Sequence, residues 1–530
     1  MRSFLHKLLG KPAASANPST SPNRPHAAAS RPLSRTLAEN IAYIRENLGR
    51  SGDLTVREFQ ASPVREVRAA LIYMEGLADK DTILVLLESL LMRVAGGLEP
   101  QLGGENDIEA ILGQLPITSV SYRTDINAIL DALLSGNTVF LLDGSLEAAA
   151  IGTRGGERRS VSEPTAQSVV RGPQEGFTED IQTNVAMVRR KIKDSKLWME
   201  TRTIGRVTKT AVTIMHIEGI AKADLLNELR ARLDRIDIDG ILESNYIEEL
   251  IQDSTFSVFP TVNNTERPDV AAAALLEGRV AIFVDGTPFV LLVPALFTQF
   301  LQAPEDYYHR SDFGLLRLLR YVALLISLLA PSLYIALTTY HQEMLPTTLL
   351  ISLAAQREGI PFPAFIEALI MEVTFELLRE AGIRMPKAIG PAISIVGALV
   401  LGQASVEAGL VSPAMVIVVS ITAIAGFIFP SFELGISIRM LRFAFMVIAA
   451  SFGFFGIIVG MILLVLHMCH LESFGTPFLA PIAPMRLSDQ KDTIVRLPWR
   501  YMYTRPKIVQ ENNETRQSGA SAGPREDPQA

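Results

Sequence analysis

Four ionisable residues lie close together in an otherwise apolar part of the chain: Glu367, Glu372, Glu376 and Arg379. From Tyr321 to His470 there are only 6 Lys or Arg and 8 Asp or Glu residues. Ionisable side chains are costly inside a membrane and often mark an ion path. If several copies met around an axis, carboxylates on one helix would ring a pore. The alternative is an amphipathic helix at the membrane surface, with its polar face in water.

The segment that carries these residues is predicted to be a helix from Ala364 to Ala381, preceded by Pro361 and Pro363. Its apolar residues recur at helical spacing and form one stripe, made of Ile366, Ile370, Val373, Leu377 and Ala381. Glu372 and Arg379 fall on the opposite face of this helix, with Glu376 beside them.

Sequence patterns for other chemistry are missing. There is no Walker A, HExxH or GxSxG pattern, so we expect no catalytic residues and no enzyme. Cys469 is the single cysteine, which excludes an intramolecular disulfide and a cysteine-rich metal site. His467 and His470 have no evident third ligand, so no metal and no cofactor are expected. A net charge of −7 gives no reason to expect nucleic-acid binding.

The apolar block is long enough for about four membrane-spanning helices. The charge-poor runs that define them are Tyr321–Tyr340, Ala388–Ala408, Val411–Pro430 and Phe443–His467. Gly456 and Gly460 have the small-xxx-small spacing that permits close helix packing in membranes. Basic residues flank both ends of the block, including Arg317, Arg320 and Arg496, which favours both ends in the cytosol.

The part before the apolar block contains a tandem duplication. Residues 74–81 resemble residues 217–224, and residues 133–144 resemble residues 275–286 at nearly the same offset. Each copy predicts strands, helices and a hairpin turn at Asp-Gly, where both turn residues must tolerate positive φ. We therefore interpret Asp143 and Asp285 as turn residues rather than as carboxylate ligands. The two lobes either frame a small-molecule cleft or serve as a docking scaffold, and composition does not choose between them.

A loop and helix are predicted between the two lobes. The loop holds Gly172, Pro173, Gly176 and Phe177, and the helix that follows carries Asn184. The basic triplet at residues 189–191 is interpreted as a solvated helix face, with an anion or lipid-headgroup contact as the alternative.

The predicted fold class is therefore α/β plus an all-α membrane domain. Two related α/β subdomains in tandem precede a helical transmembrane domain of about four spans and one amphipathic helix. The predicted boundaries are a disordered Pro/Ala/Ser-rich head at 1–50, the first subdomain at 55–165, a linking loop and helix at 166–199, the second subdomain at 200–300, the transmembrane domain at 320–470, a basic cytosolic segment at 471–507 and a disordered tail at 508–530.

The chain resembles the A subunits of the GerA-type spore germination receptors over residues 55–490. In the soluble part the resemblance is carried by Gly172–Asp180 with Asn184, Arg189–Ile192, Thr265–Asp269, Leu275–Gly278, Asp285–Phe289 and Pro304–Tyr308 with Arg310. In the apolar part it is carried by Glu343–Pro346, Arg357–Pro363, Glu367-Ala368, Met371-Glu372, Ile395–Gly402 and Val406–Pro413.

This resemblance implies a multi-pass protein of the spore inner membrane, with the two α/β subdomains in the cytosol of the spore core. It implies a transporter-like membrane B subunit and a lipoprotein C subunit as partners, contact with membrane lipid, and assembly into a homo-oligomer. It also implies that the chain helps convert nutrient (germinant) sensing into cation release, as an ion channel component. The rival interpretation is a non-conducting scaffold that assembles germination partners.

Overall fold

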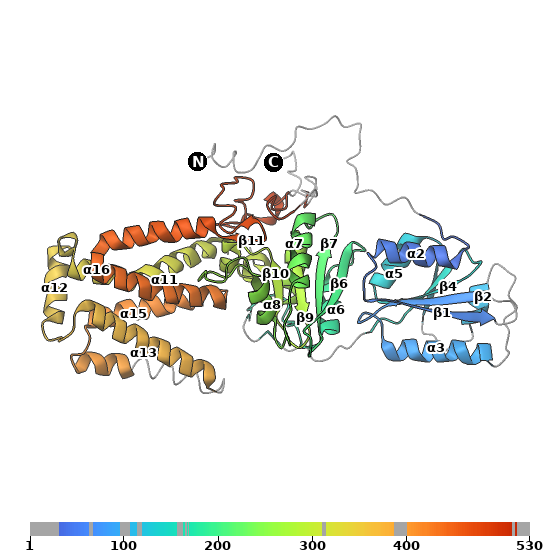
Figure 1. Cartoon of the computed structure of the whole chain (residues 1–530), viewed down its shortest axis with the longest axis horizontal. Coiled ribbons are helices and arrows are strands. Elements are labelled where there is room, and N and C mark those ends of the chain that lie inside the picture. The colour runs from blue at the N-terminus through green and yellow to red at the C-terminus, as the bar shows by residue number, and fades with distance from the viewer. Residues whose placement is uncertain are drawn as a thin grey trace, which may run out of the picture. The chain divides into compact units, whose positions relative to one another are not determined.

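The computed structural model describes residues 31–62, 67–95, 107–113, 119–155, 163–164, 167, 169–309, 314–385, 400–510 and 515–516. The chain forms two compact units (Figure 1). The lobe unit comprises residues 1–252, 262–294 and 500–530, and the helical unit comprises residues 253–261 and 295–499. Most of the predicted head, much of the predicted second span and most of the predicted tail lie outside the described residues.

The first lobe is built on a five-stranded antiparallel sheet with the order β1-β2-β4-β5-β3. Its strands are β1 (Leu54–Ser62), β2 (Val67–Met74), β3 (Val120–Arg123), β4 (Thr138–Leu142) and β5 (Ala148–Ile151). Every residue of β4 is buried, because helices cover both faces of the sheet. Those helices are α2 (Leu37–Asn47), α3 (Lys80–Ala95), α4 (Asp107–Leu112) and α5 (Ile126–Leu134).

The second lobe repeats this architecture, with the sheet order β6-β7-β9-β10-β8. Its strands are β6 (Leu197–Ile204), β7 (Thr210–Ile217), β8 (Asn263–Thr265), β9 (Val280–Val284) and β10 (Val290–Val293). Its helices are α6 (Ile181–Lys191), α7 (Ala223–Asp234), α8 (Ser244–Ile251) and α9 (Pro268–Leu276). The equal strand order in the two sheets confirms the tandem pair of related α/β subdomains.

The first lobe begins earlier than predicted. We expected residues 1–50 to be disordered, but α2 lies within that range. Its apolar side chains Leu37, Ile41 and Ile44 pack into the core of the first lobe, together with Leu33 just before the helix. The prediction is therefore wrong for residues 31–50, where burial of an apolar helical stripe outweighs the Pro- and Ser-rich composition just before it.

The helical unit holds most of the apolar sequence. Its elements are η1 (Phe297–Leu301), α10 (Glu305–Tyr308), α11 (Leu316–Thr339), η3 (Gln342–Met344), α12 (Thr347–Arg357), α13 (Ala364–Arg384), α15 (Pro413–Gly426), α16 (Phe432–His470), β11 (Glu472–Ser473) and β12 (Thr476–Pro477). The short helix η4 (Trp499–Tyr501) follows at its boundary with the lobe unit.

Two helices in the described part of the chain, rather than four, are long and apolar enough to cross a membrane: α11 and α16. The predicted span at 411–430 is the 14-residue helix α15, which is shorter than a span needs. Only 50% of the apolar window of α11 and 28% of that of α16 are buried, unlike the core helix of a soluble protein. The exposed remainder indicates a membrane protein.

Helix α16 is a hairpin of two helices rather than one straight rod. Gly453 has φ 61° and ψ −145°, which is not helical, and it falls inside the predicted span at 443–467. A Cβ built on Gly460 would lie 3.0 Å from Cε1 of Phe445. On one straight helix, two residues with the sequence separation of Phe445 and Gly460 would be about 22 Å apart. The two halves of α16 therefore pack against each other, as Figure 1 shows.

Candidate functional site

Helix α13 carries the predicted ion-path residues, and it turns them inward. Ala364, Glu367, Ala368, Met371 and Glu372 are its buried residues. The predicted apolar stripe is instead exposed at three of its members, Ile370, Val373 and Leu377. A helix at a water interface would expose the carboxylates and bury the stripe. The alternative of a polar face in water is therefore wrong for Glu372, and the observed polarity suits lipid around the unit.

Glu372 forms a buried ion pair with Arg442 of α16. The distance from Arg442 Nη1 to Glu372 Oε2 is 2.5 Å, and the two side chains are 3% and 1% exposed. Arg442 also donates from Nε to the carbonyl oxygen of Ser327 at 2.7 Å and from Nη2 to its hydroxyl at 2.8 Å. One guanidinium therefore joins α11, α13 and α16 in the interior of the helical unit.

Glu376 lies one turn further along α13 and pairs with a second arginine of α16. Arg439 Nη1 donates to Glu376 Oε2 at 2.9 Å. Arg379 approaches the other carboxylate oxygen of Glu376 at 4.0 Å, and its guanidinium lies 4.9 Å from the ring centroid of Phe427. The side chains of Glu376 and Arg379 are 31% and 18% exposed, so this end of the polar row is more accessible than Glu372.

Glu367 begins the row and holds the start of another helix. It accepts hydrogen bonds from the backbone N–H of Ser412 at 3.1 Å and from its hydroxyl at 2.9 Å. Ser412 is the N-cap of α15, and the helix dipole there favours a nearby negative charge. Arg357 donates to the other oxygen of Glu367 at 3.1 Å. Glu367 is fully buried, so it serves as an anchor between helices.

Sequence reasoning missed the arginines that complete these pairs. These are Arg439 and Arg442, which were assigned no role from the sequence. The signal that could have found them is spacing. Arg439 and Arg442 are three residues apart, and Glu372 and Glu376 are four apart, so each pair lies on one face of its helix. Two matched rows of opposite charge indicate two facing helices.

Gly456 and Gly460 lie at the contact between the two halves of α16. A Cβ at Gly456 would lie 2.8 Å from Cγ2 of Ile448, and one at Gly460 would crowd Phe445 as described above. Both glycines are buried. Their small size is therefore used within one hairpin of this chain.

A second buried ion cluster lies near the start of α11. Asp306 Oδ2 accepts from Arg317 Nε at 3.1 Å and from Arg320 Nη1 at 2.8 Å. Arg317 also pairs with Asp492 at 2.9 Å and is completely buried. From the sequence these two arginines were interpreted only as basic residues that flank the apolar block. In the structure both are buried, and carboxylates offset their burial.

The residues predicted between the lobes build the second lobe. Phe177 is buried and meets Phe283 edge-on, with ring centroids 5.7 Å apart. Asn184 exchanges two hydrogen bonds with the backbone of Thr178, at 2.7 and 2.6 Å. Pro173 accepts from Arg267 at 2.7 Å, Gly172 adopts φ 135°, and Gly176 is buried. This geometry shapes the loop before α6.

The basic triplet of α6 is only partly solvated. Arg189 is 1% exposed and holds the carboxylate of Asp53 with two hydrogen bonds, at 2.6 and 3.1 Å. It also donates to the hydroxyl of Ser51 and to the carbonyl oxygen of Leu197. The prediction of a solvated face is therefore wrong for Arg189, which ties α6 to the loop before β1.

Asp143 and Asp285 follow the turn interpretation. Asp143 accepts from the first backbone N–H of α2 at 2.8 Å, and Asp285 accepts from that of α6 at 3.3 Å. Each carboxylate thus caps a helix from the hairpin turn of its own lobe. No group of three or more His, Cys, Asp or Glu residues that could hold a metal ion occurs within the described ranges.

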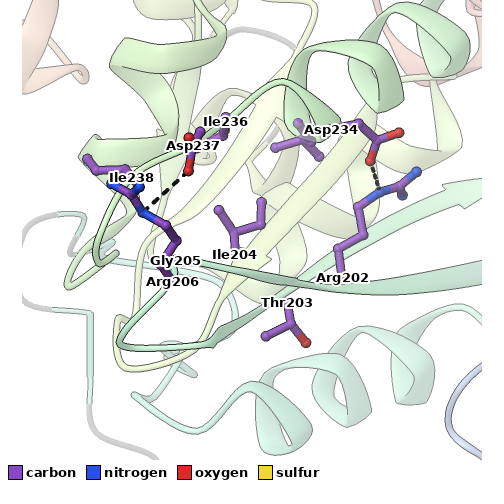
Figure 2. A pocket seen from close by; sticks show the side chains of 10 residues that line it. Arg202, Thr203, Ile204, Gly205, Arg206, Asp234, Ile236, Asp237 and Ile238 are labelled. Carbon is purple, nitrogen blue, oxygen red and sulfur yellow. Dashed lines mark hydrogen bonds and ion pairs between the residues drawn. The ribbon is translucent and has the colours of Figure 1, made fainter.

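A cavity of about 390 Å³ lies in the second lobe, beside the end of β6 and the segment after α7 (Figure 2). Its two arginines already have acidic partners. Arg202 pairs with Asp234 at 2.8 Å, and Arg206 lies 3.4 Å from Asp237. An anionic ligand would have to compete with these carboxylates. The cavity therefore offers such a ligand no unpaired arginine.

Comparison with known proteins identifies the family. Residues 42–508 match the model of the Bacillus/Clostridium GerA spore germination protein family. Spore germination protein KA of Bacillus subtilis (strain 168) is 48% identical over 487 residues, which are 92% of this chain and 89% of that protein. The uncharacterized membrane protein YfkQ of the same organism is 45% identical, over 94% of this chain and 95% of that protein.

A solved structure is similar to part of the chain. The crystal structure of the N-terminal domain of the A subunit of the Bacillus megaterium spore germinant receptor GerK3 is 42% identical. The match covers 51% of the present chain and 98% of the crystallised domain, with a TM-score of 0.41. By the extent of the family match and the identity to full-length relatives, this chain belongs to the GerA family of spore germination proteins, among the germinant receptor A subunits.

Proposed function

We propose that this chain is the membrane subunit that helps convert nutrient sensing into cation release, as part of an oligomeric ion-conducting assembly. The observation that supports conduction is the row of charges in the interior of the helical unit. Glu372, Glu376 and Arg379 lie along one side of α13 and Glu367 is buried on a different flank, while apolar side chains of the same helix face outward. Ionisable residues in the interior of a membrane protein often mark an ion path.

The exposure of these side chains divides the row into two roles. Glu367 and Glu372 are at most 1% exposed and are occupied by arginines, so they hold the helices together. Glu376 is 31% exposed and Arg379 is 18% exposed. A passing cation would therefore meet the carboxylate of Glu376 first, and this residue is our candidate for the ion path.

The remaining parts of the proposal follow from family membership. We place the protein in the spore inner membrane, with its two lobes in the cytosol of the spore core. Its proposed partners are a transporter-like membrane B subunit and a lipoprotein C subunit, with further copies of itself and membrane lipid around the helices. The proposal assigns no catalytic step to the chain.

Ion selectivity tests this role of Glu376. The complete receptor, reconstituted in liposomes, should show an altered ratio of cation to anion flux when Glu376 is replaced by Gln. Glu380→Gln is the matched control, because Glu380 lies on the same helix, is 58% exposed and pairs with Arg384 within α13. Equal selectivity in both variants and the wild type would remove Glu376 from the ion path.

The second candidate function is a non-conducting scaffold. It is favoured by the absence of a free carboxylate among Glu367, Glu372 and Glu376, each of which has an arginine partner in the described structure. A scaffold predicts that deletion of both lobes abolishes complex formation. Assembly of the helical unit with its partners in the absence of the lobes would count against it.

A further inference from the structure

The first lobe closes its fold with its own chain. Directly after β5, Arg154 forms an antiparallel bridge with Ala78. Asp79 donates its backbone N–H to the carbonyl oxygen of Thr153 at 2.8 Å, and Thr153 is 2% exposed. Residues 153–154 therefore fill a slot beside the turn that follows β2.

The second lobe has the same slot but cannot fill it in the same way. Its chain leaves after β10, and Ala295 already belongs to the helical unit, where its N–H bonds to the hydroxyl of Ser473 at 2.9 Å. By the offset of the duplication, Ala221 corresponds to Ala78. Ala221 forms its antiparallel bridge with Gln510, which lies 289 positions later in the chain (510 − 221).

The residues around Gln510 are bound as a core segment is bound. Ile508, Val509 and Gln510 are 6%, 2% and 4% exposed, although we expected a disordered tail from residue 508, and that prediction is wrong for these three residues. Lys222 donates from Nζ to the carbonyl oxygen of Ile508. Arg505 donates to the carbonyl oxygen of Leu276 at 2.9 Å.

A glycine keeps the slot open in each lobe. Gly278, at φ +97°, would place a Cβ 3.0 Å from the carbonyl oxygen of Ile220, 3.2 Å from that of Val509 and 3.3 Å from Cα of Gln510. Its counterpart Gly136, at φ +85°, would place one 2.7 Å from the carbonyl oxygen of Leu77, the residue equivalent to Ile220. In both lobes the glycine therefore makes room for the turn after the second strand, and in the second lobe it also makes room for the backbone of the bound segment.

We propose that the second lobe carries a docking slot for a peptide, formed by residues 220–222 and 276–278, and that its occupant is the C-terminal segment 505–510 of the same chain. The segment is held through its main chain at Gln510, and main-chain pairing is one of the recurring ways in which proteins bind a peptide. The segment supplies the element that the first lobe takes from residues 153–154. It also fastens the chain returning from the helical unit to the lobe from which the chain departed.

Disulfide trapping in the full-length protein tests the proposal. In a Cys469→Ser background, which removes the single cysteine, the pair Ala221→Cys and Gln510→Cys is introduced. Residues that face each other in an antiparallel pair have Cα atoms about 4.5–5.5 Å apart, within the range that a disulfide spans. After mild oxidation, maleimide-polyethylene glycol counts the free thiols. The matched positive control is Ala78→Cys with Arg154→Cys, and the mismatched control is Ala78→Cys with Gln510→Cys.

We expect both matched pairs to lose their free thiols and the mismatched pair to keep them. Free thiols in the 221/510 pair, with the 78/154 pair oxidised, would overturn the proposal. Adding Val509→Asp should lower the oxidised fraction of the 221/510 pair about tenfold, because burial of a valine side chain is lost. Val207→Asp, at a valine of the second lobe that is 78% exposed, should leave it unchanged.

A glycine pair gives an independent check. Gly278 and Gly286 have nearly equal φ, +97° and +91°, but a Cβ at Gly286 meets nothing within 4 Å. Alanine at either position therefore introduces similar backbone strain, and Gly278→Ala in addition crowds the carbonyl oxygen of Ile220 and the bound segment. Equal trapping of the 221/510 pair in the two variants would show that the slot does not hold the segment closely, and would contradict the proposal.

Discussion

Replacing Glu372 by glutamine removes one charge of a buried pair and leaves the other without compensation. Arg442 is 3% exposed and would keep its bonds to Ser327, but its Nη1 would lose the carboxylate that lies 2.5 Å away. Breaking a buried pair by removing one partner costs about 3–5 kcal/mol. The glutamine amide oxygen still accepts one hydrogen bond, so we expect a loss in the free energy of unfolding of about 3 kcal/mol.

The double variant Glu372→Gln with Arg442→Met tests whether the loss of stability arises from the uncompensated arginine. With both charges gone, no buried charge remains uncompensated, so most of the lost stability should return. Stability is measured by pulse proteolysis in urea on the detergent-solubilised full chain. Glu380→Gln, in a pair whose side chains are 58% and 78% exposed, is the control and should change stability by less than about 0.5 kcal/mol. Equal destabilisation in the single and the double variant would refute the ion-pair reasoning.

Three further perturbations follow from the structure. Arg189→Met should destabilise the lobe unit by about 3–5 kcal/mol, because it leaves the buried carboxylate of Asp53 without its partner. Arg190→Met, at an exposed position, should not destabilise it. Urea unfolding measures both variants. Burial lowers the pKa of His216 to about 4. The unfolded chain therefore binds a proton as pH falls below about 6.5 while the folded chain does not, and stability is lost progressively from pH 6.5 to pH 4, by up to about 3 kcal/mol. His216→Gln should remove that part of the pH dependence. A pH profile of stability that is unchanged in this variant would refute the role given to His216. Gly460→Val should disrupt the α16 hairpin, because the added side chain crowds Phe445. Gly359→Val is the control, because a Cβ at Gly359 meets nothing within 4 Å. Sensitivity to trypsin in detergent should rise for Gly460→Val and stay unchanged for Gly359→Val.

The architecture of the lobes could be predicted because its signals are local. The repeated blocks at 133–144 and 275–286 hold a helix end, a buried strand and an Asp-Gly turn, and each of these depends on neighbouring residues. Helix α2 was missed although Leu37, Ile41, Ile44 and Leu48 recur at helical spacing. The Pro- and Ser-rich stretch before it masked that pattern in the composition.

The polar interior of the helical unit could not be predicted to the same degree. The helix at 364–381 was predicted, but its orientation was not, because the apolar stripe faces outward when the surrounding solvent is lipid. Glu372 and Arg442 are 70 positions apart, and no local pattern joins them. Residues 221 and 510 are separated by an even longer stretch of sequence, and their pairing is visible only in the three-dimensional structure.

Nutrient-dependent cation flux from liposomes tests the central claim most directly. The chain is reconstituted alone and then with the proposed B and C partners, and flux is recorded before and after addition of nutrient. We predict flux that responds to nutrient in the complete complex, with a selectivity that changes in Glu376→Gln and not in Glu380→Gln. A verified, intact complex that releases no cation in response to any nutrient that germinates the spore would contradict conduction and favour the scaffold.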